Sequence, residues 1–173
     1  MISSMVHRYR EFKAAALGEF YLHVNDLLEH EDVQKLDCYT QHYCFSRLKH
    51  SMDVAYKSFF VAKLLGWDAR STARGGLLHD LFLYDCRSSD AADNHLTSHP
   101  QLAVENAQKL TQLNKIEQNI IRRHMWLITL TPPRYKEGYI VTFVDKYCAV
   151  REFFIGMSGV RRERELAALA AGR

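Results

Sequence analysis

The chain has 173 residues, of which 47% are hydrophobic and 25% are charged. This composition is that of an ordinary globular domain, and it excludes a disordered, collagen-like or low-complexity protein. Twenty-three basic residues against 20 acidic ones give a formal net charge of +3, which is too small to indicate nucleic-acid binding by itself. We therefore expect residues 1–173 to form a single domain with one core.

Helical spacing of apolar residues dominates the chain from its N-terminus onward. At about residues 5–30, apolar side chains recur every three or four positions and predict an amphipathic helix. Later helices are indicated by N-cap residues, apolar stripes and a proline suited to a first helical turn. Polar residues at 85–98 and two prolines within 129–134 predict loops. The later helices are predicted at about 46–65, 68–84, 100–113, 115–127 and 136–154, and residues 161–173 can extend the last one.

The sequence shows no sustained strand-like alternation, no hairpin-turn signal and no internal repeat. We therefore predict an all-α fold, a compact helical bundle. No stretch has the length and apolar character of a membrane span, and the first 20 residues lack the apolar run of a signal peptide. The four cysteines form no C-x-x-C pair, which favours a reducing compartment. These features predict a soluble, cytoplasmic protein.

Several polar residues lie on helical faces that are otherwise apolar. His50 aligns with the apolar side of its predicted helix, and Asp80 lies one turn beyond Gly76 on the inward face of the next. Buried carboxylates are costly unless they are paired or bind a metal. Each residue alone is more simply explained as a hydrogen-bonded core residue, but six together favour one shared site. The six are His50, His79, Asp80, His99, His124 and Asp145.

Four imidazoles and two carboxylates suit divalent transition metals, and iron, manganese, zinc and nickel all accept such donors. The two carboxylates carry −2, so two divalent ions would leave the site near +2 and favour an anionic ligand such as phosphate. The sequence has neither a G-x-S-x-G nucleophile motif nor a Walker phosphate-binding loop. Metal-assisted hydrolysis of a phosphate compound is therefore favoured.

The order of these residues resembles the H…HD…H…H…D signature of the HD-domain superfamily, an all-helical family of metal-dependent phosphohydrolases. The strings KHSMDVA, GLLHDLFLYD, SHP, RRHMW and FVDKYCA carry the resemblance. It implies an HD-type core at about 46–154, between the N-terminal helix at about 5–30 and a C-terminal tail at 161–173. The chain lacks the GYP extension of the cyclic-dinucleotide phosphodiesterase branch, so that specific activity is not implied.

The resemblance also implies a two-metal centre in which Asp80 is the bridging and catalytic residue. Neighbouring helical residues diverge by about 100°, so His79 can serve one ion while Asp80 reaches both. Gly75 and Gly76 would let another helix approach closely. The first ion would be bound by His50, His79, Asp80 and Asp145, and the second by Asp80, His99 and His124.

We therefore predict a metal-dependent phosphohydrolase that cleaves a phosphate ester or anhydride of a nucleotide or another small phosphorylated substrate. A metal-activated hydroxide would be the nucleophile, so no side-chain nucleophile is needed. Lys146 and Arg134 rank highest as substrate-binding residues, because the first follows a predicted ligand and the second lies on the loop before the last helix. Lys49, Arg122 and Arg123 are more simply explained as solvated surface residues.

Two alternatives stay open at this point. The same six ligands would serve an HD-fold di-iron oxygenase, and a metal-stabilised nucleotide sensor would need no catalysis. The identity and number of the metals, the substrate and the oligomeric state are also open, and a homodimer through the C-terminal helix is one expectation. Partners are expected to be small phosphorylated molecules, since neither a membrane span nor a strong nucleic-acid signal is present.

Overall fold

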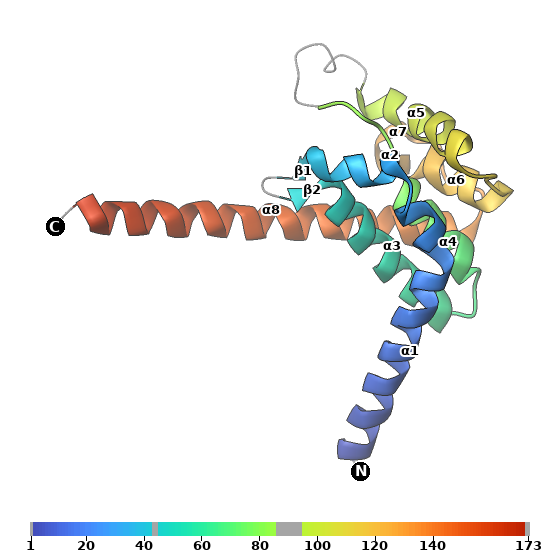
Figure 1. Ribbon diagram of the computed structural model, residues 1–173, viewed down its shortest axis with the longest axis horizontal. Coiled ribbons are helices and arrows are strands. Elements are labelled where there is room, and N and C mark those ends of the chain that lie inside the picture. The colour runs from blue at the N-terminus through green and yellow to red at the C-terminus, as the bar shows by residue number, and fades with distance from the viewer. Residues whose placement is uncertain (1, 43–44, 86–94, 172–173) are drawn as a thin grey trace.

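A computed structural model of the protein describes residues 2–42, 45–85 and 95–171 (Figure 1). Most of the predicted loop at 85–98 lies outside these residues, as do Cys44 and Cys86. The elements, in chain order, are α1 (Ile2–Leu28), α2 (Glu31–Gln34), the 3-10 helix η1 (Lys35–Cys38), β1 (Thr40–His42), β2 (Phe45–Ser46), α3 (Arg47–Leu64), α4 (Ala69–Leu78), α5 (His95–Leu110), α6 (Lys115–Arg123), α7 (Trp126–Thr129) and α8 (Lys136–Ala171).

The predicted all-α bundle is confirmed, with one small addition. Strands β1 and β2 form an antiparallel pair in which Thr40 lies opposite Ser46. The two strands have three and two residues, which is too short for alternation to be visible in the sequence. No helix of the described part of the chain combines the length and the apolar character needed to cross a membrane.

Side-chain caps begin three of the helices where the sequence indicates. The Ser46 side chain accepts the Lys49 backbone N–H before α3, and the Asp68 side chain accepts that of Ser71 before α4. Asn114 and Glu117 form a reciprocal capping box at α6. Caps of this kind satisfy amide groups that have no partner within the helix, so they fix where each helix starts.

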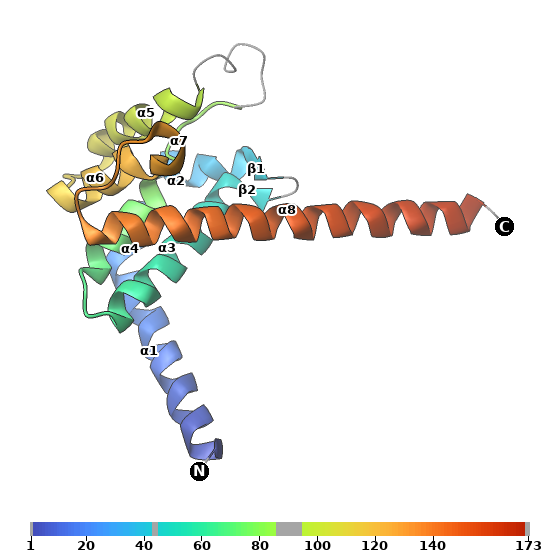
Figure 2. The same cartoon turned by 180° about the vertical axis from the view of Figure 1, so that it is seen from behind.

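Helix α4 is the centre of the bundle, because it packs against α1, α3, α5, α6 and α8. Around it lies a core that includes Phe20, Phe59, Leu77 and Ile121, none of which is more than 1% exposed. The first turns of α1 and the second half of α8 extend away from this body in different directions (Figures 1 and 2). The site residues are therefore carried by the central helices and not by the projecting ones.

Two glycines of α4 allow its close contacts, as predicted. A Cβ atom on Gly76 would lie 3.0 Å from the Cα of Ala55 in α3, and one on Gly75 would lie 2.9 Å from a methyl group of Ile120 in α6. Carbon atoms in ordinary contact are about 3.5–4.0 Å apart, so both positions exclude a side chain. This approach brings the end of α4 between α3 and α6.

The prediction that the third helix runs to Tyr84 is wrong, since α4 ends at Leu78. The chain turns there, with the Leu81 amide donating to the Leu78 carbonyl and the Phe82 amide to the Asp80 carbonyl. Side chains from other elements then bond the following carbonyls, in place of the amides of a continued helix. Asn106 bonds Leu81 at 3.0 Å, Arg47 bonds Phe82 at 2.6 Å and Tyr39 bonds Leu83 at 3.0 Å.

Three other boundaries differ from those predicted. Helix α5 begins at His95, so Pro100 lies inside it and not in its first turn. Helix α6 ends at Arg123, and the His124 ring nitrogen Nδ1 bonds the Ile121 carbonyl at 2.8 Å where the helix stops. A separate helix, α7, covers Trp126–Thr129, and the turn predicted at 129–134 begins at its last residue. The extension of the last helix through the tail is confirmed to Ala171.

One face of α8 exposes large apolar side chains. Phe143, Tyr147, Val150 and Phe154 are spaced by four, three and four residues, and each is at least 55% exposed. This spacing places them on a single stripe of the helix. The homodimer expected through the C-terminal helix stays a prediction, and so does the division of the chain into a core at 46–154 with flanking segments.

We predict that Gly76→Ala destabilises the protein by about 1–3 kcal/mol, because the new methyl group would meet the backbone of Ala55. The matched control is Gly18→Ala in α1, where a Cβ has open space. Alanine is favoured over glycine in an exposed helix, so this control keeps or raises stability by up to about 1 kcal/mol. Urea denaturation measures both, and equal stabilities for the two variants would contradict the close approach.

Candidate metal centre

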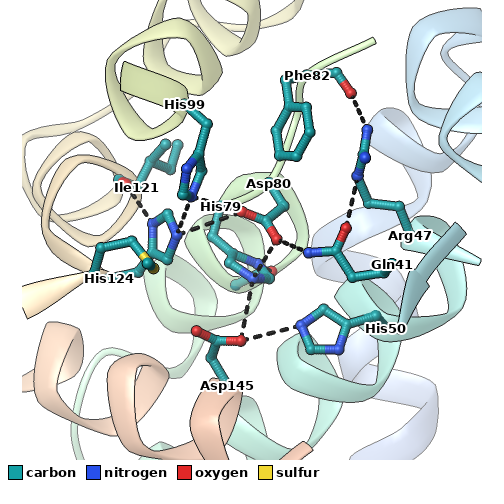
Figure 3. A network of polar contacts seen from close by, with 12 residues as sticks. Gln41, Arg47, His50, His79, Asp80, Phe82, His99, Ile121, His124 and Asp145 are labelled. Atoms are coloured by element: carbon teal, nitrogen blue, oxygen red, sulfur yellow. Dashed lines mark hydrogen bonds and ion pairs between the residues drawn. The ribbon is translucent and has the colours of Figure 1, made fainter. Parts of the chain in front are cut away.

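The six predicted residues meet in one buried cluster, and none of them is more than 5% exposed (Figure 3). They come from α3, the end of α4, α5, the end of α6 and α8, which are spread over almost a hundred residues of chain. His50 Nε2 lies 3.1 Å and His79 Nε2 lies 3.8 Å from Asp145 Oδ1. His99 Nε2 and His124 Nε2 each lie 3.4 Å from Asp80 Oδ1.

Asp80 lies between the two halves of this cluster. Its Oδ1 faces the imidazoles of His99 and His124, whereas its Oδ2 lies 3.5 Å from His79 Nε2 and accepts a hydrogen bond from Gln41 at 2.5 Å. The prediction that Asp80 points inward is therefore confirmed, but it does so from the turn after α4 and not from the helix itself. Two oxygens that face different imidazoles give this carboxylate the geometry of a bridging group.

Hydrogen bonds at Nδ1 orient three of the four imidazoles. His79 Nδ1 bonds the Gly76 carbonyl at 2.7 Å, and His124 Nδ1 bonds the Ile121 carbonyl at 2.8 Å. A carbonyl only accepts, so in both rings Nδ1 carries a proton, and Nε2, which faces the cluster, presents a lone pair when the ring is neutral. His50 Nδ1 bonds Glu152 at 3.0 Å. Metal-binding histidines are typically held in this way, with the second nitrogen donating to a carbonyl or a carboxylate.

Two buried atoms at the centre of the cluster have unused bonding capacity. Among the described residues, His79 Nε2 and Asp80 Oδ1 are shielded from water and make no hydrogen bond. His99 Nε2 and His124 Nε2, moreover, lie only 3.0 Å apart. A cation beside these atoms would use their unsatisfied bonding capacity, and buried charges are stable when they coordinate a metal.

The donor atoms are close enough together to hold metal ions. Three overlapping groups each bring their ligand atoms within 4.8 Å of one another: His50 with His79 and Asp80, His79 with His124 and Asp145, and Asp80 with His99 and His124. Neutral imidazoles and carboxylates are donors that divalent iron, manganese, zinc and nickel accept. The residues thus fit such an ion, while the geometry leaves both its identity and the number of ions open.

Charge interactions keep both carboxylates ionised in spite of burial. Burial raises the pKa of Asp80, but the charge of the neighbouring His79 and the nearby rings of His124 and His99 outweigh it and hold that pKa well below its usual range. Burial likewise raises the pKa of Asp145, but the hydrogen bond from His50 and the nearby His79 reverse the shift and lower that pKa well below its usual range. The cluster therefore presents negative oxygens to any ion that enters it.

The imidazoles respond differently to the same burial. For His50, burial lowers the pKa, but Asp145 and Glu152 more than compensate and raise the pKa to about 10. For His124, burial prevails over Asp80 and leaves the pKa lowered. Without an ion, His50 is thus protonated near neutral pH and its Nε2 donates to Asp145, whereas His124 stays neutral.

The residues that support the cluster are not among those predicted from the sequence. Glu152 is 1% exposed and anchors His50 from α8, two turns beyond Asp145. That spacing places both carboxylates on one helical face, a signal that could have identified it. Gln41 bonds Asp80 and in turn accepts from Arg47 Nε at 2.8 Å. Gln41 lies on a short strand that nothing in the sequence predicts.

The two predicted substrate-binding residues lie in different surroundings. Lys146 is half-buried, and its Nζ donates to Asp145 Oδ2 at 2.7 Å, which places it at the edge of the cluster. Arg134 is exposed and lines a surface pocket with Arg122 and Arg123. The roles of Lys146 and Arg134 in substrate binding stay predictions.

Comparison with known proteins relates the chain to enzymes named ribonuclease Y. It is 35% identical to that of Aquifex aeolicus over 117 residues, which are 67% of this chain and 18% of the relative. The match to the Thermotoga maritima enzyme is 32% over the same length, and that to the Bacillus subtilis enzyme is 36% over 78 residues. The chain thus spans a fifth or less of these relatives. No family model matches it, and no solved structure gives a significant match.

We predict that Glu152→Gln weakens Mn²⁺ binding about 10- to 100-fold, as is usual when a partner of a ligating histidine is changed. The glutamine keeps the shape but loses the charge that anchors the His50 ring. Isothermal titration calorimetry with Mn²⁺ measures the dissociation constant. Glu105→Gln on the exposed face of α5 is the control and should bind as the wild type does. Equal affinity in all three proteins would contradict the supporting role of Glu152.

We also predict that Mn²⁺ binding strengthens as the pH rises from 6 to 8, by about ten-fold or more per pH unit. The His50 pKa of about 10 means that a proton occupies this ring in the metal-free protein throughout that range. The proton must leave before Nε2 can bind an ion, and each proton released adds about one factor of ten per pH unit. Competition with a chelating dye at several pH values measures this slope. A pH-independent affinity would show that His50 is not a ligand.

Proposed function

We propose that the protein is a metal-dependent phosphohydrolase of the HD-domain type whose substrate contains a phosphodiester bond. The observation that carries this proposal is the convergence of four imidazoles and two ionised carboxylates in one buried cluster, with Nε2 lone pairs and carboxylate oxygens facing its centre. Similarity to relatives named as ribonucleases supports the choice of a phosphodiester over a phosphate anhydride.

We assign the metal ligands as His50, His79, Asp80, His99, His124 and Asp145. All six lie within the proposed core at about 46–154. Asp80 is the bridging residue in this assignment, because its two oxygens face imidazoles on opposite sides. Two bound ions are proposed, since the two oxygens of Asp80 face different imidazoles and so divide the six donors into two sets.

Divalent ions held there would polarise phosphoryl oxygens and lower the pKa of a bound water toward neutrality. The protein's own residues supply the charge and the orientation of the ligand groups. Asp80 and Asp145 stay ionised, and Gln41 donates to Asp80 Oδ2, which limits rotation of the carboxylate. Lys146 lies at the cluster edge with one N–H on Asp145 and a second on Met125 Sδ, which leaves one donor for a phosphoryl oxygen. Arg134 is proposed to bind a more distant phosphate.

Hydrolysis of bis-p-nitrophenyl phosphate by the Mn²⁺-loaded protein tests this proposal. We expect turnover that a chelator abolishes and added Mn²⁺ restores. Asp80→Asn and His79→Ala should each lose more than about 100-fold in kcat/KM, a loss beyond that caused by changing an outer partner of a ligand. Metal per chain should fall in the same variants.

His23→Gln is the control, since His23 is a half-buried histidine of α1 that lies outside the cluster, 3.8 Å from Glu19. It should keep both metal and activity. Oxygen uptake that depends on ferrous iron, without phosphodiester cleavage, would show that the protein is an oxygenase and not a hydrolase. Tight nucleotide binding without any product would indicate a sensor.

A further inference from the structure

A basic pocket lies on the face of α6 that points away from the metal-ligand cluster. It has a volume of about 220 Å³ and is lined by four cationic side chains together with amide groups and one tyrosine. No carboxylate lines it. The cations come from α6 and from the loop that leads into α8, two segments that lie side by side in both ribbon views (Figures 1 and 2). They are Lys115, Arg122, Arg123 and Arg134.

These four cations lack acidic partners, in contrast to others in the protein. Within the part of the chain that the structure describes, none of the four lies within ion-pair distance of a carboxylate. Lys57 pairs with Asp53 at 2.9 Å and Lys63 pairs with Glu19. Gathering like charges around one pocket is unfavourable until an anion enters it, so the pocket is suited to an anionic ligand.

The arrangement along the helix indicates an extended anion. Lys115, Asn119 and Arg122 are spaced by four and three residues, so they share a face with Arg123 beside them. From Lys115 to Arg123 the row is about 12 Å long at the rise of an α-helix. One phosphate group would use only part of that length. A nucleic-acid strand carries a phosphate at every nucleotide, so it would place successive charges along the whole row.

The pocket also offers groups that suit a nucleotide strand. Tyr135 is half-buried in its wall, and aromatic side chains beside basic grooves stack with bases of single strands. Asn119 accepts the Arg134 backbone amide at 2.8 Å, which fixes the loop that carries the fourth cation. Arg122 and Arg123 directly precede His124, whose ring points into the cluster on the other side of the helix (Figure 3).

We propose that this pocket binds the backbone phosphates of a single-stranded RNA. The choice of RNA and its identification as a substrate rest on the proposed function, whereas the binding of a polyanionic strand rests on the cation row. Because the contacts are with phosphates, binding is independent of base sequence and weakens with salt.

Fluorescence anisotropy with a labelled single-stranded 12-nucleotide RNA tests the proposal, in EDTA so that no cleavage occurs. The variant is Arg122→Gln with Arg123→Gln, and the control is Lys13→Gln with Lys57→Gln, which removes the same charge from a different pocket. We expect the variant to bind RNA at least about ten-fold more weakly in 0.1 M salt, with a log–log salt slope smaller by about 1.4. The control should bind within about two-fold of the wild type.

Equal RNA affinity in variant and wild type, an equal loss in the control, or no RNA binding by the wild type would overturn the proposal. The proposal would also be overturned if calorimetry showed that inorganic phosphate binds at least as tightly as the RNA does. Thermal melting and Mn²⁺ content check that the variant is folded. Wild-type hydrolysis of bis-p-nitrophenyl phosphate is measured separately. If it fails while RNA binding still needs the two arginines, the proposed function is wrong and the pocket assignment stands.

Discussion

The structure depends on burying four imidazoles and two carboxylates at the place where its central helices meet. In an apolar interior such groups are costly unless each is bonded or charge-compensated. Two sets of groups meet this requirement, one at the outer nitrogens of the rings and one at the inner nitrogens. Backbone carbonyls of Gly76 and Ile121 and the carboxylate of Glu152 fix the outer nitrogens of the rings, while Asp80 and Asp145 face the inner ones. The remaining capacity at the centre is what would allow the cluster to hold metal ions.

Packing and chemistry at this centre use the same residues. Gly75 and Gly76 let α4 approach α6 and α3, which carry His124 and His50. The turn that follows α4 sets Asp80 between them, and Arg47, Asn106 and Tyr39 hold the carbonyls of that turn. A carboxylate on a continued helix would point in one fixed direction from the helix axis. On the turn it can face imidazoles on two sides.

Helix α6 divides the two functions proposed here between its faces. Its buried face includes Ile120 and Ile121 and ends at His124, whereas its outer face carries the cation row of the basic pocket. The capping box of Asn114 and Glu117 fixes where this helix begins and so sets which residues each face presents. One amphipathic element thereby connects a buried donor cluster with a surface suited to a polyanion.

The sequence alone determined that several buried residues are chemically unusual, because an aspartate or histidine on an apolar helical stripe is visible from spacing. His50, His99, His124 and Asp145 could be identified in this way, as could the caps at Ser46 and Asp68. The tertiary structure alone decided where α4 stops, since the bonds that end it come from Arg47, Asn106 and Tyr39, which are distant in sequence. It also decided that Gln41 and Glu152 support the cluster and that Arg134 joins Arg122 at the surface. Periodicity reports the direction of a side chain from its own helix, but contacts between segments depend on how the helices pack.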